Sequence, residues 1–176
     1  METARPLAAE LGELNRQRQV MTRQFVEQAR EMLAALENVP YLSFIAGEDF
    51  HPGVVGLVAS KLKERLHRPV IAFAPSEPGS ASLRGSARSI PGFHIRDALA
   101  RVEAARPGLM ERFGGHAMAA GLSLPRENFE AFEAAFLEAA AAMIAPESLQ
   151  ETIASDGELP PDAFHIHNAC ALRDGG

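Results

Sequence analysis

The sequence predicts an α/β fold: a mixed β-sheet of about four to five strands, flanked by helices and preceded by a long helix. Apolar runs at 41–46 and 70–74 enclose an amphipathic segment at 54–67. Strand, helix and strand with short connections form a βαβ unit, so part of the sheet is expected to be parallel. Two further amphipathic segments, at 95–105 and 128–144, supply helices that can cover the sheet.

Residues 7–37 are predicted to form one long amphipathic helix. Only Gly12 interrupts the segment before Pro40 ends it. Apolar side chains recur at steps of three, four and seven residues, namely Leu7, Leu11, Leu14, Met21, Phe25, Met32 and Leu36. Such a helix extends about 45 Å, more than a small domain needs for its own core. A helix of this kind usually connects two bodies or pairs with another helix.

Shorter strands are predicted at 80–89 and 122–124. Between them, residues 113–121 read FGGHAMAAG, with three glycines, four alanine or methionine residues and no charge. This stretch is predicted to be a turn, because it has the pattern of neither an amphipathic helix nor an ordinary strand. Paired glycines allow a positive φ and close approach to a ligand, and His116 could help to hold an anion. A glycine turn with a chance histidine fits the same pattern.

The composition indicates a folded domain in a reducing compartment. The chain has 176 residues, 47% of them hydrophobic and 23% charged, which is enough for a proper core. The single cysteine, Cys170, excludes an internal disulfide and a cysteine-based zinc site. No apolar run approaches the roughly 20 residues that span a bilayer, and the N-terminus lacks a signal peptide. We therefore expect a cytoplasmic protein without a membrane partner.

The distribution of charge along the chain says more about possible phosphate binding than the net charge does. A formal net charge of −6 gives no basic footprint for nucleic acid at the level of the whole chain. Between positions 79 and 112, however, all the basic residues apart from His94 are arginines, whose planar fork suits phosphate. They are Arg84, Arg88, Arg96, Arg101, Arg106 and Arg112, against Asp97, Glu103 and Glu111. A solvated face of mixed charge would give the same local excess.

The segment SLRGSARS is a second candidate for phosphate binding. Arg84 and Arg88 bracket Gly85 and Ser86, and Ser89 follows them. Arginine makes charge-assisted, often bidentate contacts with phosphate, and serine hydroxyls and backbone N–H groups can complete the cradle. A polar edge strand would look the same.

Taken together, the two segments predict a two-sided phosphate clamp, with Gly114, Gly115 and His116 on its second side. The other histidines are weaker candidates: His51 stands at a helix entrance, and His94 could cap a helix. Carboxylates and histidines are too scattered to hold two metal ions about 3.5–4 Å apart. No metal site and no catalytic residue are predicted in this chain.

Four motifs resemble those of RecJ-type single-strand-specific exonucleases, in the same order and spacing. They are FGGHAMAAG, GSARS followed by GFH, HPGVVGLVAS, and LNRQRQ at 14–19. The region from about 11 to 145 is similar to the connecting helix and the DHH-associated domain of DHH-family phosphoesterases. The tail motif SDGEL at 155–159 resembles the lead-in to the OB-fold domain of that family.

The resemblance implies three segments. Residues 1–39 would be the long connecting helix, and residues 40–146 the DHH-associated, substrate-binding domain. Residues 147–176 would be a linker and the incomplete start of an OB-fold-like domain.

The resemblance also implies a division of labour. RecJ enzymes digest single-stranded DNA from 5′ to 3′ in repair and recombination, using Mn²⁺ or Mg²⁺. The metal ligands belong to an N-terminal DHH domain, whose Asp-His-His triplet is absent from this sequence. The chain would therefore bind single-stranded DNA, pack against that DHH domain, need no cofactor of its own and be inactive alone.

By the same resemblance, Arg88 with its neighbouring serines and His116 with its neighbouring glycines would contact DNA phosphate, with Arg84 as a third contact. Two other functions fit the residues. One is a DHH phosphoesterase acting on short oligonucleotides or cyclic dinucleotides, which shares the Gly-Gly-His motif. The other is a non-catalytic nucleic-acid-binding or interaction module.

Overall fold

The computed structural model describes residues 4–33, 41–45, 52–152, 155, 157–158 and 160–174. Its centre is one five-stranded sheet in the order β1-β2-β3-β5-β4. The strands are β1 (Leu42–Ile45), β2 (Val70–Pro75), β3 (Ser82–Arg88), β4 (Arg112–Gly115) and β5 (Ala119–Pro125). β1 pairs with β2 in parallel, and the other neighbours are antiparallel, which confirms the predicted mixed sheet.

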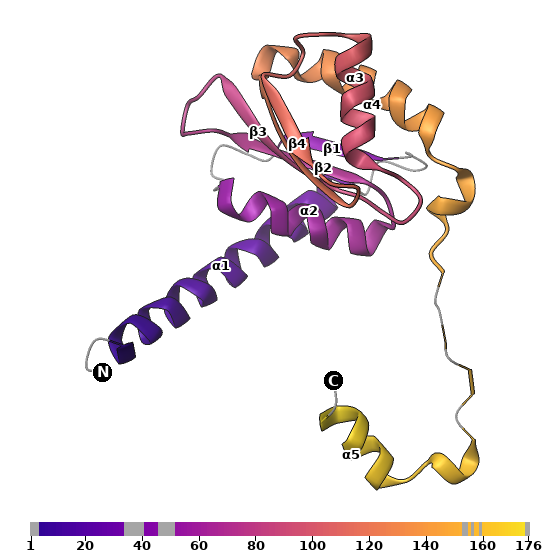
Figure 1. Ribbon diagram of the computed structural model, residues 1–176. Helices are drawn as coiled ribbons and strands as arrows, with labels where there is room; N and C mark the ends of the chain where they lie inside the picture. Colours follow the sequence, from indigo (N-terminus) through magenta and orange to yellow (C-terminus); the bar gives the residue numbers. More distant parts are fainter. Residues whose placement is uncertain are drawn as a thin grey trace.

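Helices cover both faces of the sheet (Figure 1). On one face lie α1 (Ala4–Leu33) and α2 (Pro52–Leu66), and on the other lie α3 (Ile95–Ala105) and α4 (Phe129–Met143). The predicted segments at 54–67, 95–105 and 128–144 are thus confirmed as helices. Short 3-10 turns occur at Arg126–Asn128, Pro146–Leu149 and Pro161–Ala163, and the tail ends in α5 (Ile166–Asp174).

Two apolar cores meet at β2, whose residues are all buried. Successive side chains of a strand point to opposite faces. Ile71 and Phe73 accordingly join the core under α3 and α4, around Phe132 and Phe136. The intervening residues Val70, Ala72 and Ala74 join a smaller core with α2 and the α1 residue Phe25.

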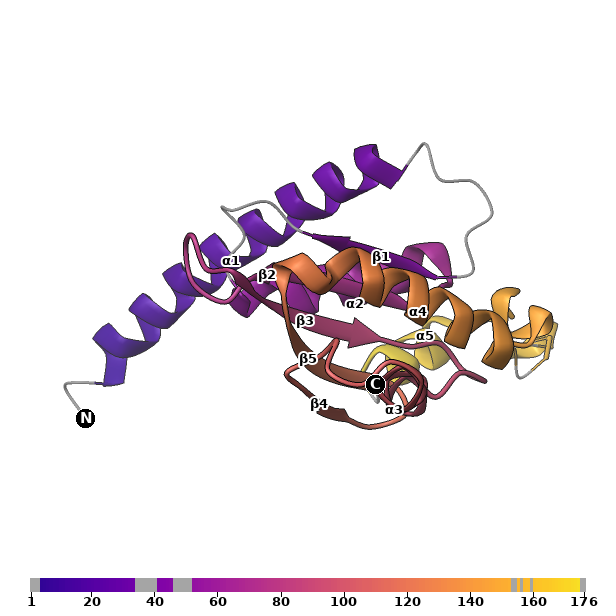
Figure 2. The same cartoon turned by 90° about the horizontal axis from the view of Figure 1, so that it is seen from above.

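The long N-terminal helix is confirmed as far as residue 33, and residues 34–40 lie outside the described ranges. Its later part packs on α2, where Phe25 is buried. Its first half extends beyond the sheet (Figure 2), and Leu7, Leu11 and Leu14 are 63%, 68% and 54% exposed. None of the helices in the described ranges is long and apolar enough to cross a membrane.

The prediction for residues 113–121 was wrong in one respect. Residues 112–115 and 119–125 are paired antiparallel strands, with the turn confined to the tip at 116–118. Backbone ladder bonds need no side chain, so Gly114 can pair with Gly121 although neither has strand propensity. The predicted strand at 122–124 is correspondingly longer.

Candidate nucleic-acid interface

Alternation along β3 separates its polar side chains from its apolar ones. Leu83 and Ala87 are buried in the core under α3 and α4. Arg84, Ser86 and Arg88 therefore share the opposite face, the one on which α2 lies. Because α2 packs over β2 and β3, Ser86 and Arg88 lie against that helix, near Gly56 and Ser60.

Strand register extends this face across β5 and β4. Ser86 pairs with Gly121, which in turn pairs with Gly114. Gly121 and Gly114 are both exposed, so the sheet is open beyond the edge of α2. The predicted arginine-serine segment and the predicted glycine segment are thus neighbours in the sheet, because β3 pairs directly with residues 119–121.

Arg88 is held in place by the residues around it. Its Nε donates a hydrogen bond to Ser60 Oγ of α2 at 3.1 Å. Its Nη1 donates to Ser86 Oγ at 3.0 Å and to the Ala87 carbonyl oxygen at 2.9 Å. Within the described ranges the two N–H groups on Nη2 have no hydrogen-bond partner. A guanidinium fixed on one side and free on the other is suited to bind an anion.

Gly56 of α2 makes room for this arrangement. A Cβ atom at position 56 would lie 2.9 Å from Arg88 Nη2 and 3.0 Å from Ser86 Oγ. Ser60, one helical turn later, accepts from Arg88 and donates its own proton to the Gly56 carbonyl oxygen at 2.9 Å. Position 56 therefore sets where the guanidinium can lie.

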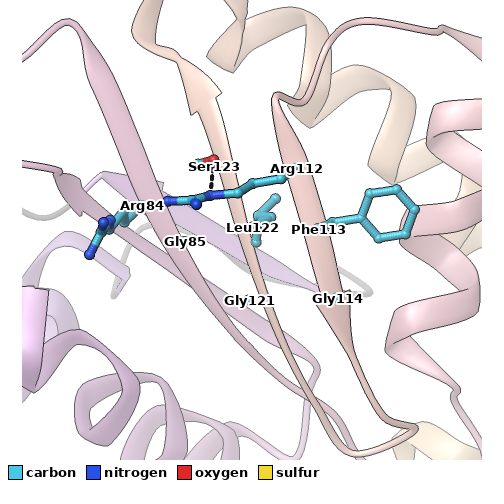
Figure 3. A pocket seen from close by; sticks show the side chains of 8 residues that line it. All are labelled: Arg84, Gly85, Arg112, Phe113, Gly114, Gly121, Leu122 and Ser123. Atoms are coloured by element: carbon cyan, nitrogen blue, oxygen red, sulfur yellow. Dashed lines mark hydrogen bonds between the residues drawn. The ribbon is translucent and has the colours of Figure 1, made fainter.

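A hollow of about 400 Å³ opens on the same face of the sheet (Figure 3). It is lined by Arg84, Gly85, Arg112, Phe113, Gly114, Gly121, Leu122 and Ser123. Arg84 and Arg112 come from the strands on either side of β5, and both are exposed. Phe113 points away from the hollow toward the helices (Figure 3).

The hairpin tip places His116 at the same end of the sheet as Arg88. The His116 N–H donates to the Ala119 carbonyl oxygen at 2.8 Å, and Ala119 is the β5 partner of Arg88. Gly115 has a φ of +143°, and a Cβ there would lie 2.4 Å from the Ala119 carbonyl oxygen. The backbone conformation of the turn therefore requires glycine at position 115. His116 itself is exposed.

Two of the predicted contact residues, Ser89 and Gly85, are buried and have packing roles. Ser89 is 1% exposed, and its hydroxyl donates to the Phe93 carbonyl oxygen at 2.6 Å. Its hydroxyl is therefore not presented at the surface. Gly85 is a core glycine: a Cβ there would lie 2.6 Å from side-chain atoms of both Leu122 and Phe73. Only its backbone borders the hollow.

Of the two weaker histidine candidates, only His94 lies in the described residues. His94 caps α3, since its Nδ1 accepts from the Asp97 N–H at 3.2 Å, which confirms the predicted cap. His51 lies outside the described residues. Across the described ranges, no group of three or more histidine, cysteine, aspartate or glutamate side chains could hold a metal ion.

Arg112 was missed as a site residue, as were Gly121, Gly56 and Ser60. Arg112 stands directly before the FGGH motif, and its place follows from strand alternation with Gly114. This alternation can be read from the sequence only if residues 112–115 are recognised as a strand. Gly56 and Ser60 are read only from the packing of α2 on β3.

Comparison with known protein families assigns the chain to one of them. The family model described as the DHHA1 domain matches residues 38–142. The chain belongs to the DHHA1 domain family, as the resemblance to DHH-associated domains predicted.

Within that family the chain is similar to RecJ exonucleases. It is 44% identical over 177 residues to the single-stranded-DNA-specific exonuclease RecJ of Escherichia coli, covering 98% of this chain. RecJ of Thermus thermophilus is 31% identical over 131 residues, which is 74% of this chain and 18% of that protein. The chain spans 30% of the length of the Escherichia coli relative.

Solved structures agree with the sequence comparison. A crystal structure of exonuclease RecJ bound to manganese matches with a TM-score of 0.66 and 31% identity, covering 85% of this chain and 34% of that chain. RecJ from Thermus thermophilus in complex with Mn²⁺ matches with a TM-score of 0.65 and 32% identity, covering 80% of this chain and 20% of that chain. The predicted resemblance to RecJ-type exonucleases is confirmed.

Proposed function

We propose that this chain is the single-stranded-DNA-contacting part of a RecJ-type 5′ to 3′ exonuclease that acts in DNA repair and recombination. The observation that carries the proposal is the Arg88 anchor, by which we mean Arg88 held by Ser60 and Ser86 beside the open glycine strands. Similarity to RecJ over nearly the whole chain supports the nuclease assignment.

The face suits a polyanionic backbone. Arg88 has free donors on Nη2, within the part of the chain that the structure describes, and exposed Gly114 and Gly121 let a strand approach the sheet closely. Arg84 and His116 would add contacts at either end of the same face. Donors fixed in advance also stabilise negative charge that develops on a phosphoryl group during hydrolysis.

The metal chemistry is assigned to a part of the enzyme outside this chain. Within the described ranges no group of three or more histidine, cysteine, aspartate or glutamate side chains could hold a metal ion, and we assign this part of the chain to DNA binding. We propose that a DHH domain of the same protein supplies the Mn²⁺ or Mg²⁺ site. That domain would close against the face described here, and the chain alone would not hydrolyse DNA.

A binding titration tests the proposal. We expect the chain to bind an oligothymidylate of about twelve nucleotides at low salt, more tightly than duplex of the same length. Arg88→Ala should weaken binding about tenfold, because it removes a charge-assisted phosphate contact. Affinity that is equal for duplex, or that Arg88→Ala leaves unchanged, would contradict the assignment.

The same titration distinguishes the proposed function from the alternative of a phosphoesterase that acts on short oligonucleotides or cyclic dinucleotides. An enzyme of that kind would bind a dinucleotide at least as tightly as the longer strand. The proposal predicts the reverse, because successive phosphates of a long strand would engage several residues along the face.

A further inference from the structure

We propose that Arg112 and Arg84 form a second phosphate subsite, distinct from the Arg88 anchor, which takes another phosphate of the same single strand. The inference rests on the proposed function and extends it to a residue outside the recognised motifs. It follows from the hollow between β3, β5 and β4.

The register brings the two arginines to opposite sides of one position on β5. Arg84 pairs with Ser123, and Ser123 pairs with Arg112. Arg112 Nε donates to Ser123 Oγ at 3.3 Å, and Figure 3 shows its side chain lying across β5 toward β3. This bond fixes the guanidinium while both of its Nη atoms have no hydrogen-bond partner within the described ranges.

The two arginines of the hollow have no ion-pair partner among the described residues. Both side chains are exposed and line the hollow from the strands on either side of β5. The adjacent acidic residue, Glu111, bonds a hydroxyl instead, since its Oε2 accepts from Ser82 Oγ at 3.1 Å. Two arginines that face one hollow repel each other, so an anion between them relieves the repulsion.

Gly114 and Gly121 form the floor of the hollow, and packing does not explain why both are glycines. At Gly114 a Cβ atom would meet nothing within 4 Å, and at Gly121 it would meet only the Gly85 carbonyl oxygen at 3.9 Å. Neither residue has a positive φ. Glycine weakens a strand, so its presence at two paired positions is explained by keeping the floor open to a ligand.

The subsite and the anchor reach different phosphates. Arg84 and Arg88 are four residues apart on one strand face, so their Cα atoms are separated by about 13 Å. The guanidinium groups are also held by different partners, Arg88 by Ser60 and Ser86 and Arg112 by Ser123 across β5, so we assign them to different phosphates. The face is therefore suited to an extended single strand with several phosphates rather than to a mononucleotide.

The test is an oligothymidylate titration of the 176-residue chain over a salt series. Arg112→Ala should weaken binding about tenfold and reduce the slope of log affinity against log salt by about 0.7, the value for one phosphate contact on a single strand. Gly121→Val should also weaken binding, although it removes no charge, because its side chain fills the floor.

Arg101→Ala is the matched control, since Arg101 is an exposed arginine on α3, across the sheet from the hollow. It should leave affinity and slope close to those of the wild type. If Arg112→Ala behaves like Arg101→Ala while Arg88→Ala still weakens binding, the subsite is wrong and the proposed function stands. A wild-type chain without affinity for single-stranded DNA at low salt would overturn both.

Discussion

At the scale of single residues, the proposed site depends on how Arg88 is positioned as well as on its presence. Ser60 and Ser86 accept from its guanidinium, and Gly56 leaves the space that it occupies. A motif identifies the arginine, but Ser60 and Gly56, which position it, come from a different element. Substitutions at those supporting positions should therefore separate function from stability.

Gly56→Ala should weaken binding of single-stranded DNA several-fold with little loss of stability. The new methyl group would lie 2.9 Å from Arg88 Nη2, the flexible end of a side chain that can move away. Alanine also favours a helix interior over glycine by about 1 kcal/mol. Oligothymidylate titration and thermal unfolding measure the two effects.

Gly12→Ala is the matched control, because a Cβ atom at that α1 position meets nothing within 4 Å. It should leave DNA affinity unchanged. Equal affinity in both variants would show that the position of the Arg88 guanidinium does not matter.

Tyr41 provides a prediction about stability on the other face. Its hydroxyl donates to the Glu133 carbonyl oxygen at 2.8 Å, and its side chain is 7% exposed. Loss of this bond in Tyr41→Phe should lower the free energy of unfolding by about 1 kcal/mol at neutral pH. Urea unfolding measures the change.

Burial, and then the nearby Glu133 carboxylate, raise the pKa of the Tyr41 phenol above its ordinary value of 10.0. The unfolded chain therefore loses this proton at a lower pH than the folded chain. The contribution of Tyr41 to stability is complete below about pH 10 and declines as the pH rises above it. Tyr41→Phe should consequently lose less stability than the wild type on going from neutral pH to about pH 11. A parallel decline in both proteins would contradict the raised pKa.

At the scale of elements, the β4–β5 hairpin carries the glycines for two different reasons. Gly115 is required by the backbone, since its φ is +143° and its Cβ would clash with Ala119 and Ala120. Gly114 is required by neither conformation nor packing. Folding thus explains the glycine at 115, whereas the proposed DNA contact gives a reason for the glycine at 114.

Gly115→Ala should lower the free energy of unfolding by about 3 kcal/mol, through backbone strain and overpacking at the turn. Gly114→Ala should change it by less than about 0.5 kcal/mol, because the new methyl group meets open space. Chemical denaturation of the two variants makes the comparison. A similar loss in both would mean that the hairpin needs glycine throughout.

The elements with strong periodicity were predictable from the sequence. Helices α2, α3 and α4 and the buried strand β2 follow from apolar spacing and from the prolines and glycines at their ends. Strand β4 was not predictable in this way, because Gly114 and Gly115 carry no strand propensity. Its pairing is set by the tertiary register with β5, and Arg112 was missed for that reason.

The site was likewise predictable only in part from the sequence. Arg84, Ser86 and Arg88 share a face because their spacing is that of a strand. Ser89 breaks from that face: β3 ends at Arg88, and the Ser89 hydroxyl turns inward to the Phe93 carbonyl oxygen. Contacts between α2 and β3 depend on the crossing of two elements, which no local pattern encodes.

At the scale of the whole molecule, the two faces of the sheet are covered unequally. One face is buried under α3 and α4, and contains the larger core. The other is covered by α2 over β2 and β3, while Gly121 on β5 and Gly114 on β4 remain exposed. Arg84, Arg88 and Arg112 all lie on this second face, so the proposed function and the open surface coincide.

The most direct test of this account is an NMR titration of the chain with oligothymidylate at low salt. We expect backbone amide signals to shift along β3, β4 and β5, with Gly114 and Gly121 among the largest changes. Signals from the exposed side of α3 and α4 should stay in place. Shifts confined to those helices, with the glycine signals unmoved, would contradict the claim that the open face of the sheet binds single-stranded DNA.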